Sequence, residues 1–173
     1  MTERVMVDIE TLGLDPGCAV LSIGAVRFDA DGRGEDLYVN IDRESCESAG
    51  LHVDEETLEW WQQQDEDAQA VLSGGGSLEQ ALVDLKGFGG DVDEWWANPP
   101  KFDMAILEAA YDAVGMDAPW EFYELRDVRT LKKLPGAEIP EEKGVKHDAL
   151  DDARNQARVV AANLRLLQGD SSE

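Results

Sequence analysis

The chain has 173 residues and a formal net charge of −23, from 38 acidic and 15 basic side chains. This length suits one domain with a full hydrophobic core, and no run approaches the roughly 18 apolar residues of a membrane span, so we expect no membrane association. Cys18 and Cys46 are too few for a disulfide framework and form no C-x-x-C pair, which indicates a reducing cytoplasm.

The chain opens with the signals of a three-stranded antiparallel meander. Apolar and β-branched residues predict strands over residues 5–9, 19–28 and 36–41. The sequence DADGRG, residues 29–34, predicts a tight turn between the second strand and the third. The first residues show no secretion signal and are typical of the start of a strand.

The rest of the chain alternates helices with short strands. Asp54 and Ser77 are expected N-caps of two helices, the first leading into LEWWQQQ and the second following the flexible segment SGGGS. The later elements are predicted, in order, as a strand over 91–97, a helix over 102–114, a strand over 121–125, a helix over 127–134, a loop at 143–146 and a long helix over 148–167.

This order of elements predicts an α/β fold. We expect a mixed sheet, with three antiparallel strands followed by parallel strands, flanked by helices on both faces. Residues 1–168 should form a single domain, and residues 169–173 a disordered tail.

Asp8 and Glu10 stand two residues apart in the first predicted strand, so both carboxylates point to the same face. The same spacing recurs at 42–44 and 54–56, where a solvated turn explains it, so spacing alone is weak. The apolar neighbours in VMVDIE indicate a buried strand, in which unpaired carboxylates are costly and a metal ion would remove that cost. Two-metal phosphodiester hydrolysis needs converging carboxylates, and oxygen ligands suit Mg²⁺ or Mn²⁺.

Three later residues are candidates for the same site. Asp103 begins an apolar helix, either as a ligand or as an acid that the helix dipole favours. Asp152 lies one turn after Asp148, the expected N-cap of the last helix, whereas Asp151 would point about 100° away. His147 precedes that helix, where it is either solvated or placed to take a proton near neutral pH.

The charge balance leaves three interpretations open, because −23 is the wrong sign for a protein that grips phosphates directly. The first is a domain that never meets a polyanion. The second is a protein of a high-salt cytoplasm whose surface acids maintain solubility, and the third is an enzyme whose acids hold cations that bridge to phosphate; the second and third can both hold. Six of the fifteen basic residues fall within residues 126–146, either as a patch that guides a polyanion or as a solvated surface.

Taken together, the motifs resemble the DEDDh branch of the DnaQ-like exonucleases, and most closely the group of phage DexA-type and small bacterial exoribonucleases. The matching segments are Asp8-Ile9-Glu10-Thr11, then Phe102-Asp103, then His147-x-Ala149-x-x-Asp152. Gly24, the pair Trp60-Trp61 and residues 126–131 match as well. The resemblance extends from residue 6 to about residue 167 and implies an RNase H-like fold.

The resemblance implies a role for each motif residue. Asp8, Glu10, Asp103 and Asp152 would hold two divalent cations, Mg²⁺ or Mn²⁺, with Asp8 bridging both. His147 would be the general base that deprotonates the attacking water.

It also implies substrate contacts. Thr11, with backbone amides nearby, would contact the terminal 3′ nucleotide, and Leu12 would pack against its base or sugar. Trp61 is favoured over its neighbour as the ring that faces a base, and stacking contributes about 1–3 kcal/mol per base. Phe102 would either stack on a nucleotide or pack, and Arg129 belongs to the basic segment that would contact the rest of the strand.

The implied activity is the release of 5′-mononucleotides from the 3′ end of single-stranded RNA or DNA, with RNA favoured. A homodimer is plausible because relatives often pair. Three other functions stay open. One is a DNA-directed exonuclease of the proofreading or repair type, and another is a non-catalytic RNase H-like module that binds nucleic acid. The third is an acidic protein that buffers cations.

Overall fold

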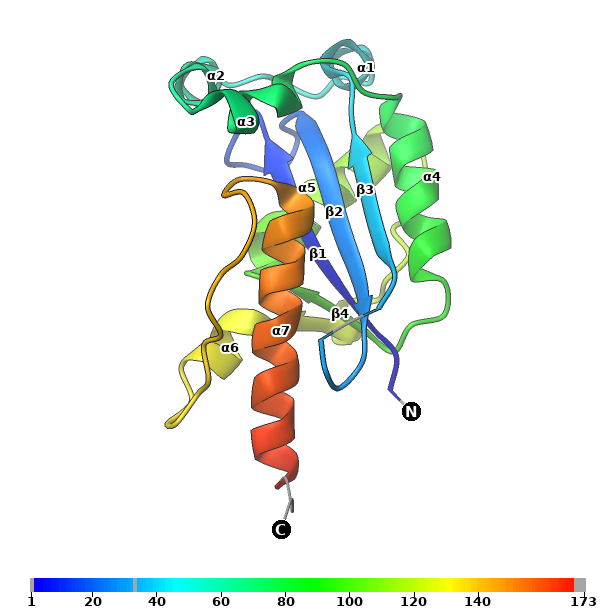
Figure 1. Cartoon of the computed structure of the whole chain (residues 1–173). Coiled ribbons are helices and arrows are strands. Elements are labelled where there is room, and N and C mark those ends of the chain that lie inside the picture. Colours follow the sequence, from blue (N-terminus) through cyan, green and yellow to red (C-terminus); the bar gives the residue numbers. More distant parts are fainter. Residues whose placement is uncertain (1, 33, 170–173) are drawn as a thin grey trace.

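In the computed structural model, which describes residues 2–32 and 34–169, a single five-stranded sheet forms the centre of the molecule (Figure 1). The strand order is β3-β2-β1-β4-β5. Neighbours are antiparallel from β3 to β1 and parallel from β1 to β5, so the predicted mixed sheet is confirmed. The strands are β1 (Arg4–Thr11), β2 (Val20–Phe28), β3 (Asp36–Asn40), β4 (Glu94–Ala97) and β5 (Leu125–Asp127).

Helices cover both faces of this sheet. On one face pack α4 (Leu78–Gly89) and α5 (Pro100–Ala113), and on the other α7 (Ala149–Gln168) runs along the strands with α6 (Val128–Lys132) beside it (Figure 1). The shorter segments are α1 (Arg43–Ser48), α2 (Glu55–Gln62), α3 (Glu66–Gln69), η1 (Ala70–Leu72) and η2 (Phe122–Glu124). Within the described residues, no helix combines the length and apolar character that crossing a lipid bilayer requires.

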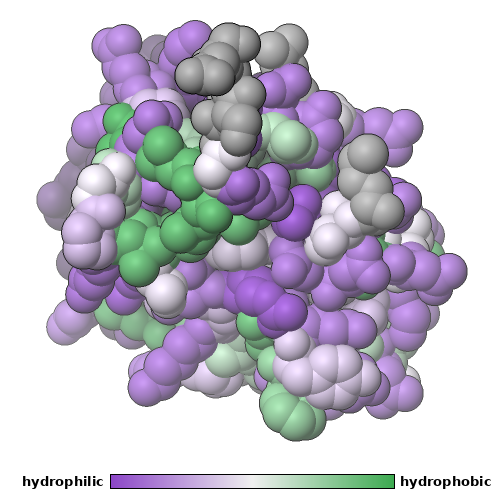
Figure 2. Space-filling model, turned by 90° about the horizontal axis from the view of Figure 1, so that it is seen from below, coloured by the Kyte–Doolittle hydropathy of each residue, from purple (hydrophilic) through white to green (hydrophobic). Residues whose placement is uncertain are grey.

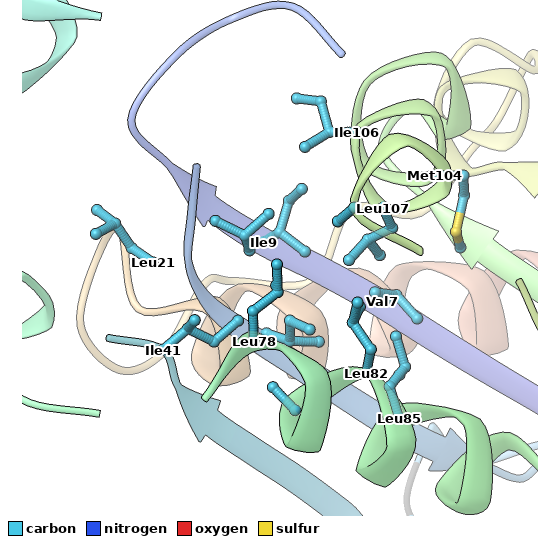
Figure 3. Close-up of a cluster of buried hydrophobic side chains, with 14 of the residues drawn as sticks. Val7, Ile9, Leu21, Ile41, Leu78, Leu82, Leu85, Met104, Ile106 and Leu107 are labelled. Carbon is cyan, nitrogen blue, oxygen red and sulfur yellow. The ribbon is translucent and has the colours of Figure 1, made fainter. Parts of the chain in front are cut away.

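The side chains of β1 alternate between two cores, as the period of a strand requires. Val7 and Ile9 point into the main core, among the leucines and isoleucines of β2, α4 and α5 (Figure 3). Met6 belongs to the smaller core beneath α7. Asp8 and Glu10 follow Met6 at intervals of two, so their carboxylates lie on the α7 face of the sheet.

Helix α7 lies directly against the sheet at Gly24 of β2. A Cβ added at this position would overlap the backbone of Ala149 and Leu150. Gly24 is also the residue that pairs with Asp8 between β2 and β1. Glycine therefore lets the first turn of α7 rest on the sheet next to Asp8.

Several predicted boundaries are wrong in detail. The strand expected over 121–125 is instead the 3₁₀ turn η2 followed by β5, and the strand expected over 91–97 shortens to β4. We did not predict α1 and α3, because helices of four to six residues carry little periodicity. The N-caps at Asp54, Ser77 and Asp148 are confirmed. In the predicted tail, Gly169 caps α7, and residues 170–173 lie outside the described part.

We expect Gly24→Ala to destabilise the fold and to displace the start of α7, because the added methyl group has no space beside Ala149. Overpacking of this kind costs about 1–3 kcal/mol, which urea unfolding can measure. Gly87→Ala is the control, since Gly87 lies in α4 with nothing within 4 Å of an added Cβ. It should stabilise the protein by about 0.5–1 kcal/mol. Unchanged stability in Gly24→Ala would contradict this account.

Candidate active site

Three carboxylates meet on the α7 face of the sheet. Asp8 and Glu10 come from the last residues of β1, just before a bulge in its pairing with β2, and Asp152 comes from the start of α7. One ligand oxygen from each lies within 4.8 Å of the other two. Glu10 and Asp152 are 142 positions apart in the sequence, and the packing of helix on strand brings them together with Asp8.

Asp103 reaches the same region from the other side of β1. It lies in the first turn of α5, and only 3% of the residue is exposed. Its Oδ1 accepts a hydrogen bond from the backbone N–H of Ile9 at 3.3 Å, which ties the helix to β1 between Asp8 and Glu10. Its carboxylate lies outside the 4.8 Å group, yet its charge raises the pKa of both Asp8 and Glu10.

The start of α7 carries three acids, and their hydrogen bonds determine which of them points to the site. Asp148 caps the helix by accepting the backbone N–H of Asp151 at 2.9 Å. Asp151 turns outward, where it accepts the N–H of Val145 and pairs with Arg154. Asp152 then points to the sheet, as the helical spacing predicts.

His147 lies directly before this cap, next to the carboxylates. Electrostatic attraction to His147 and a hydrogen bond from its backbone both lower the pKa of Asp152, against the larger effect of burial. His147 has φ +61°, a left-handed conformation that costs a non-glycine residue about 1–2 kcal/mol. Its ring packs edge-on against Trp60 at a centroid distance of 5.0 Å. Strain of this kind persists where the surroundings hold a residue in place, which is common at functional sites.

Burial and mutual repulsion make these acids reluctant to ionise. Loss of solvation, followed by the charges of Asp152 and Asp103, raises the pKa of Glu10 from 4.5 to about 8. Burial raises the pKa of Asp103 from 3.8 to about 7, although backbone hydrogen bonds oppose it. The pKa of Asp8 is also raised well above its ordinary value, by burial and then by Asp103 and Glu10.

This donor set fits a divalent-cation site. In the described part of the chain, none of the four acids forms an ion pair with a lysine or arginine. Arg129 is close enough to lower the pKa of Asp103, but as the smallest of the named effects. Hard carboxylate oxygens without a basic partner are the ligands that Mg²⁺ and Mn²⁺ prefer. A bound cation would relieve both the repulsion and the cost of burial.

A pocket of about 410 Å³ opens beside the carboxylates. Its volume lies within the range of small-ligand sites. The lining residues are Ile9, Glu10, Thr11, Leu14, Asp54, Glu56, Thr57, Trp60, Trp61 and Phe102. Aromatic walls with a carboxylate at one end suit a ligand that has a flat ring and a group directed at the acids.

The two tryptophans of the pocket differ in exposure. Trp61 is 1% exposed, and its Nε1 donates a hydrogen bond to the backbone oxygen of Thr11 at 2.9 Å. Trp60 is 41% exposed and presents the more open ring. Both line the pocket, so a base-facing Trp61 stays a prediction, while Trp60 offers the larger free surface for stacking.

Of the other predicted substrate contacts, some lie at the pocket and others do not. Leu12 is fully buried in the main core, so in this structure it presents no surface to a nucleotide. Thr11 and Phe102 both line the pocket, although the hydroxyl of Thr11 already donates to the backbone oxygen of Gly13 at 2.7 Å. Arg129 is exposed near Asp103.

The basic segment 126–146 lies only partly at the site. Arg129 is near Asp103, and Lys132 lines a second pocket of about 250 Å³ together with Asp8 and Asp152. Arg126 instead pairs with Glu94, the first residue of β4, at 3.6 Å, and Lys143 binds Asn155 through its backbone. Arg129 and Lys132 are thus the members of the segment that these contacts place beside the acids.

The sequence profile of the 3′-5′ exoribonuclease Rv2179c-like domain matches residues 3–164. The chain belongs to this family. The family is described as a 3′-5′ exoribonuclease domain, so the predicted class of enzyme, an exonuclease, is confirmed. A sequence search among curated proteins gives no significant match.

Solved structures similar to this Rv2179c-like domain confirm the RNase H-like exonuclease fold. The nuclease domain of 3′hExo, a DEDDh family member bound to rAMP, has a TM-score of 0.68 at 11% identity, over 96% of this chain and 92% of the other. Pop2p of S. pombe, in an Mg²⁺- and Mn²⁺-bound form, has a TM-score of 0.68 at 16% identity, over 98% and 86%. Exonuclease I of E. coli, in complex with an oligonucleotide, has a TM-score of 0.67 at 15% identity, over 98% and 41%.

Gln156 is a residue at the site that was not foreseen from the sequence. Its Nε2 donates a hydrogen bond to Asp8 Oδ1 at 2.6 Å. Gln156 follows Asp152 by four residues, a spacing that places both on one side of a helix, and that spacing was the available signal. Trp60, the less favoured of the two tryptophans in the prediction, lines the pocket as well.

The raised pKa values predict how the metal-free protein responds to pH. Between about pH 4 and pH 8 the folded protein holds protons on Glu10 and Asp103 that the unfolded chain releases, so stability should fall as pH rises through this window. We expect the Tm in EDTA to decrease from pH 5 to pH 8, and Asp103→Asn to show a smaller decrease. Surface repulsion acts on both proteins alike, so parallel Tm curves would contradict the shift at Asp103.

Proposed function

We propose that this chain is a metal-dependent 3′-5′ exonuclease that removes 5′-mononucleotides from the 3′ end of single-stranded nucleic acid, with RNA favoured. The observation that carries the proposal is the meeting of Asp8, Glu10 and Asp152 within 4.8 Å, with Asp103 and His147 beside them. The Rv2179c-like family supplies the reaction class, and its description as an exoribonuclease supports RNA.

Two divalent cations, Mg²⁺ or Mn²⁺, would be held by Asp8, Glu10, Asp103 and Asp152. When bound, such ions polarise the phosphate and stabilise the charge on the leaving oxygen. Pop2p, which has the same fold, is described in an Mg²⁺- and Mn²⁺-bound form, which supports this choice of metal.

His147 would take a proton from the attacking water, whose oxygen forms a bond to phosphorus as the bond to the 3′ oxygen of the preceding nucleotide breaks. The products are a 5′-mononucleotide and a chain with a new 3′-hydroxyl. The packing of its ring on Trp60 and its left-handed backbone conformation would keep the imidazole beside Asp152. A side chain held in this way loses little entropy on reaching the transition state.

The terminal nucleotide would occupy the pocket of about 410 Å³, with its base against Trp60 and Phe102 and its sugar toward Glu10 and Thr11. A pocket of this size encloses one nucleotide, which would explain a requirement for a free end. The 3′hExo domain is described as bound to rAMP, which supports recognition of a ribonucleotide by this fold.

The second candidate is an exonuclease directed at DNA. Exonuclease I, of the same fold, is described in complex with an oligonucleotide named as dT13, so the fold alone does not select RNA. The distinction rests on whether the pocket requires a 2′-hydroxyl.

We further propose a cytoplasmic location and a homodimer. Two buried free thiols, Cys18 and Cys46, are compatible with a reducing compartment.

For the homodimer, the end of the molecule where α7 finishes shows an apolar area in Figure 2, and the last turn of α7 carries the exposed Leu166 and Leu167. Sedimentation at micromolar concentration measures the state.

End-labelled single-stranded RNA and DNA oligonucleotides test the activity directly. With Mn²⁺ we expect a ladder that shortens from the 3′ end, faster on RNA, and no cleavage in EDTA. Asp152→Ala should slow the reaction on the order of 100-fold or more, because metal activation contributes several kcal/mol. Asp112→Ala, an exposed acid on α5, is the control with the same charge change. Full activity of Asp152→Ala, or of the EDTA-treated enzyme, would refute the proposal, and equal rates on RNA and DNA would favour the second candidate.

Trp60→Ala tests the stacking surface. We expect substrate binding to weaken by about 1–3 kcal/mol, because stacking on one aromatic ring contributes that much. Fluorescence anisotropy with a labelled oligonucleotide in Ca²⁺ measures the affinity, and circular dichroism verifies the fold. Phe122→Ala, which truncates a ring that is 82% exposed and absent from the pocket lining, should bind as wild type does. Equal affinities for all three proteins would remove Trp60 from the binding site.

A further inference from the structure

Gln156 connects two of the elements that supply the carboxylates. It lies on α7 one turn after Asp152, on the same side of the helix, and is 8% exposed. Its Nε2 donates a hydrogen bond to Oδ1 of Asp8 at 2.6 Å. The side chain thus joins the helix that carries Asp152 to the strand that carries Asp8.

The packing of α7 does not account for an amide at this position. The buried residues around it on α7, Ala153, Ala157 and Val160, are apolar and belong to the smaller core. Within the described residues, Oε1 of Gln156 is buried and has no hydrogen-bond partner. A buried amide that is only half satisfied weakens a fold, so an apolar side chain would suit the core better. The one hydrogen bond that the amide forms goes to Asp8.

A neutral donor has a particular advantage at Asp8. A lysine or arginine would neutralise the carboxylate and compete with a cation for it, and a further acid would add to a repulsion that already involves Asp103 and Glu10. An aliphatic side chain would leave the carboxylate free to rotate. The glutamine amide fixes the orientation of one carboxylate oxygen and leaves the negative charge in place.

We propose that Gln156 is a positioning residue, which holds the Asp8 carboxylate in the orientation that binds the catalytic cations. The inference rests on the proposed function, because it assumes that Asp8 is a metal ligand. It assigns Gln156 no contact with the substrate.

Isothermal titration of the full chain with Mn²⁺, in the absence of nucleic acid, tests this role in Gln156→Met, which keeps the length of the side chain and removes the donor. We expect the dissociation constant for Mn²⁺ to rise about 10-fold, as for other residues that orient a ligand. The Tm of the metal-free variant should stay close to that of wild type, because removal of the unsatisfied Oε1 offsets the loss of the hydrogen bond to Asp8. In assays with an RNA oligonucleotide, kcat should fall while KM stays the same.

The control is Asn163→Leu, which removes another buried amide from α7. Asn163 is 2% exposed and binds Glu138 and Val159, away from the carboxylates. It should lower the Tm and leave the Mn²⁺ affinity within twofold of wild type. Wild-type affinity in Gln156→Met, or an equal loss in Asn163→Leu, would overturn the role of Gln156. A wild-type protein that binds no Mn²⁺ would overturn the proposed function as well, which separates the two failures.

If Gln156→Met does not fold, nuclear magnetic resonance of the wild-type protein tests the same role. The side-chain amide resonances of Gln156 should shift during titration with Mg²⁺ and saturate together with the heat of binding. The side-chain amide of Asn163 should stay unchanged in the same spectra. A Gln156 signal that does not respond to Mg²⁺ would overturn the inference.

Discussion

The repulsion among buried carboxylates is the constraint on which the rest of the site depends. Asp8, Glu10 and Asp152 bring their oxygens within 4.8 Å of one another, and Asp103 adds its charge from α5. Burial and repulsion raise the pKa values of Asp8, Glu10 and Asp103, so a bound cation would favour their ionised forms. The fold holds them together by packing, so the binding energy of a metal would not be spent on gathering the ligands. Preorganisation of this kind would suit a metal-dependent hydrolase.

The close approach of α7 to the sheet makes that gathering possible. Gly24 removes the side chain that would separate α7 from β2, and Ala149, Ala153 and Ala157 keep the facing side of the helix small. Since Gly24 pairs with Asp8 in the sheet, this close contact between helix and sheet falls next to the carboxylates. A contact that resembles ordinary core packing thus sets the geometry of the site.

The acidic surface and a polyanionic substrate are compatible if affinity arises locally. The pocket beside Glu10 has aromatic walls, on which a base would stack without regard to charge, and cations held by the carboxylates would in turn bind phosphate. Arg129 near Asp103 and Lys132 in the second pocket add positive charge close to the acids. The net charge of −23 would then slow non-specific association and leave binding to this small area.

The sequence by itself determined the mixed sheet and the shared face of Asp8 and Glu10 in the first strand, and it predicted Asp103, Asp152 and His147 as candidates for the same site. It did so because strand alternation and helix caps are local properties of the chain, and because the order of the motifs resembles that of a known family. The choice of Asp152 over Asp151 also followed from helical geometry alone. Short segments such as α1, α3 and η2 escaped prediction, since their few residues carry no periodic pattern.

Only the tertiary structure decided which neighbouring side chain is buried. Trp60 and Trp61 have the same chemistry, and the sequence contains no local signal that says which of the two is buried. In the fold both line the pocket, and Trp61 is the buried one, with a hydrogen bond to Thr11. Leu12 is withdrawn into the main core by the same packing. The bond from Gln156 to Asp8 joins residues 148 positions apart, and contacts of that range depend on how helix and sheet pack together.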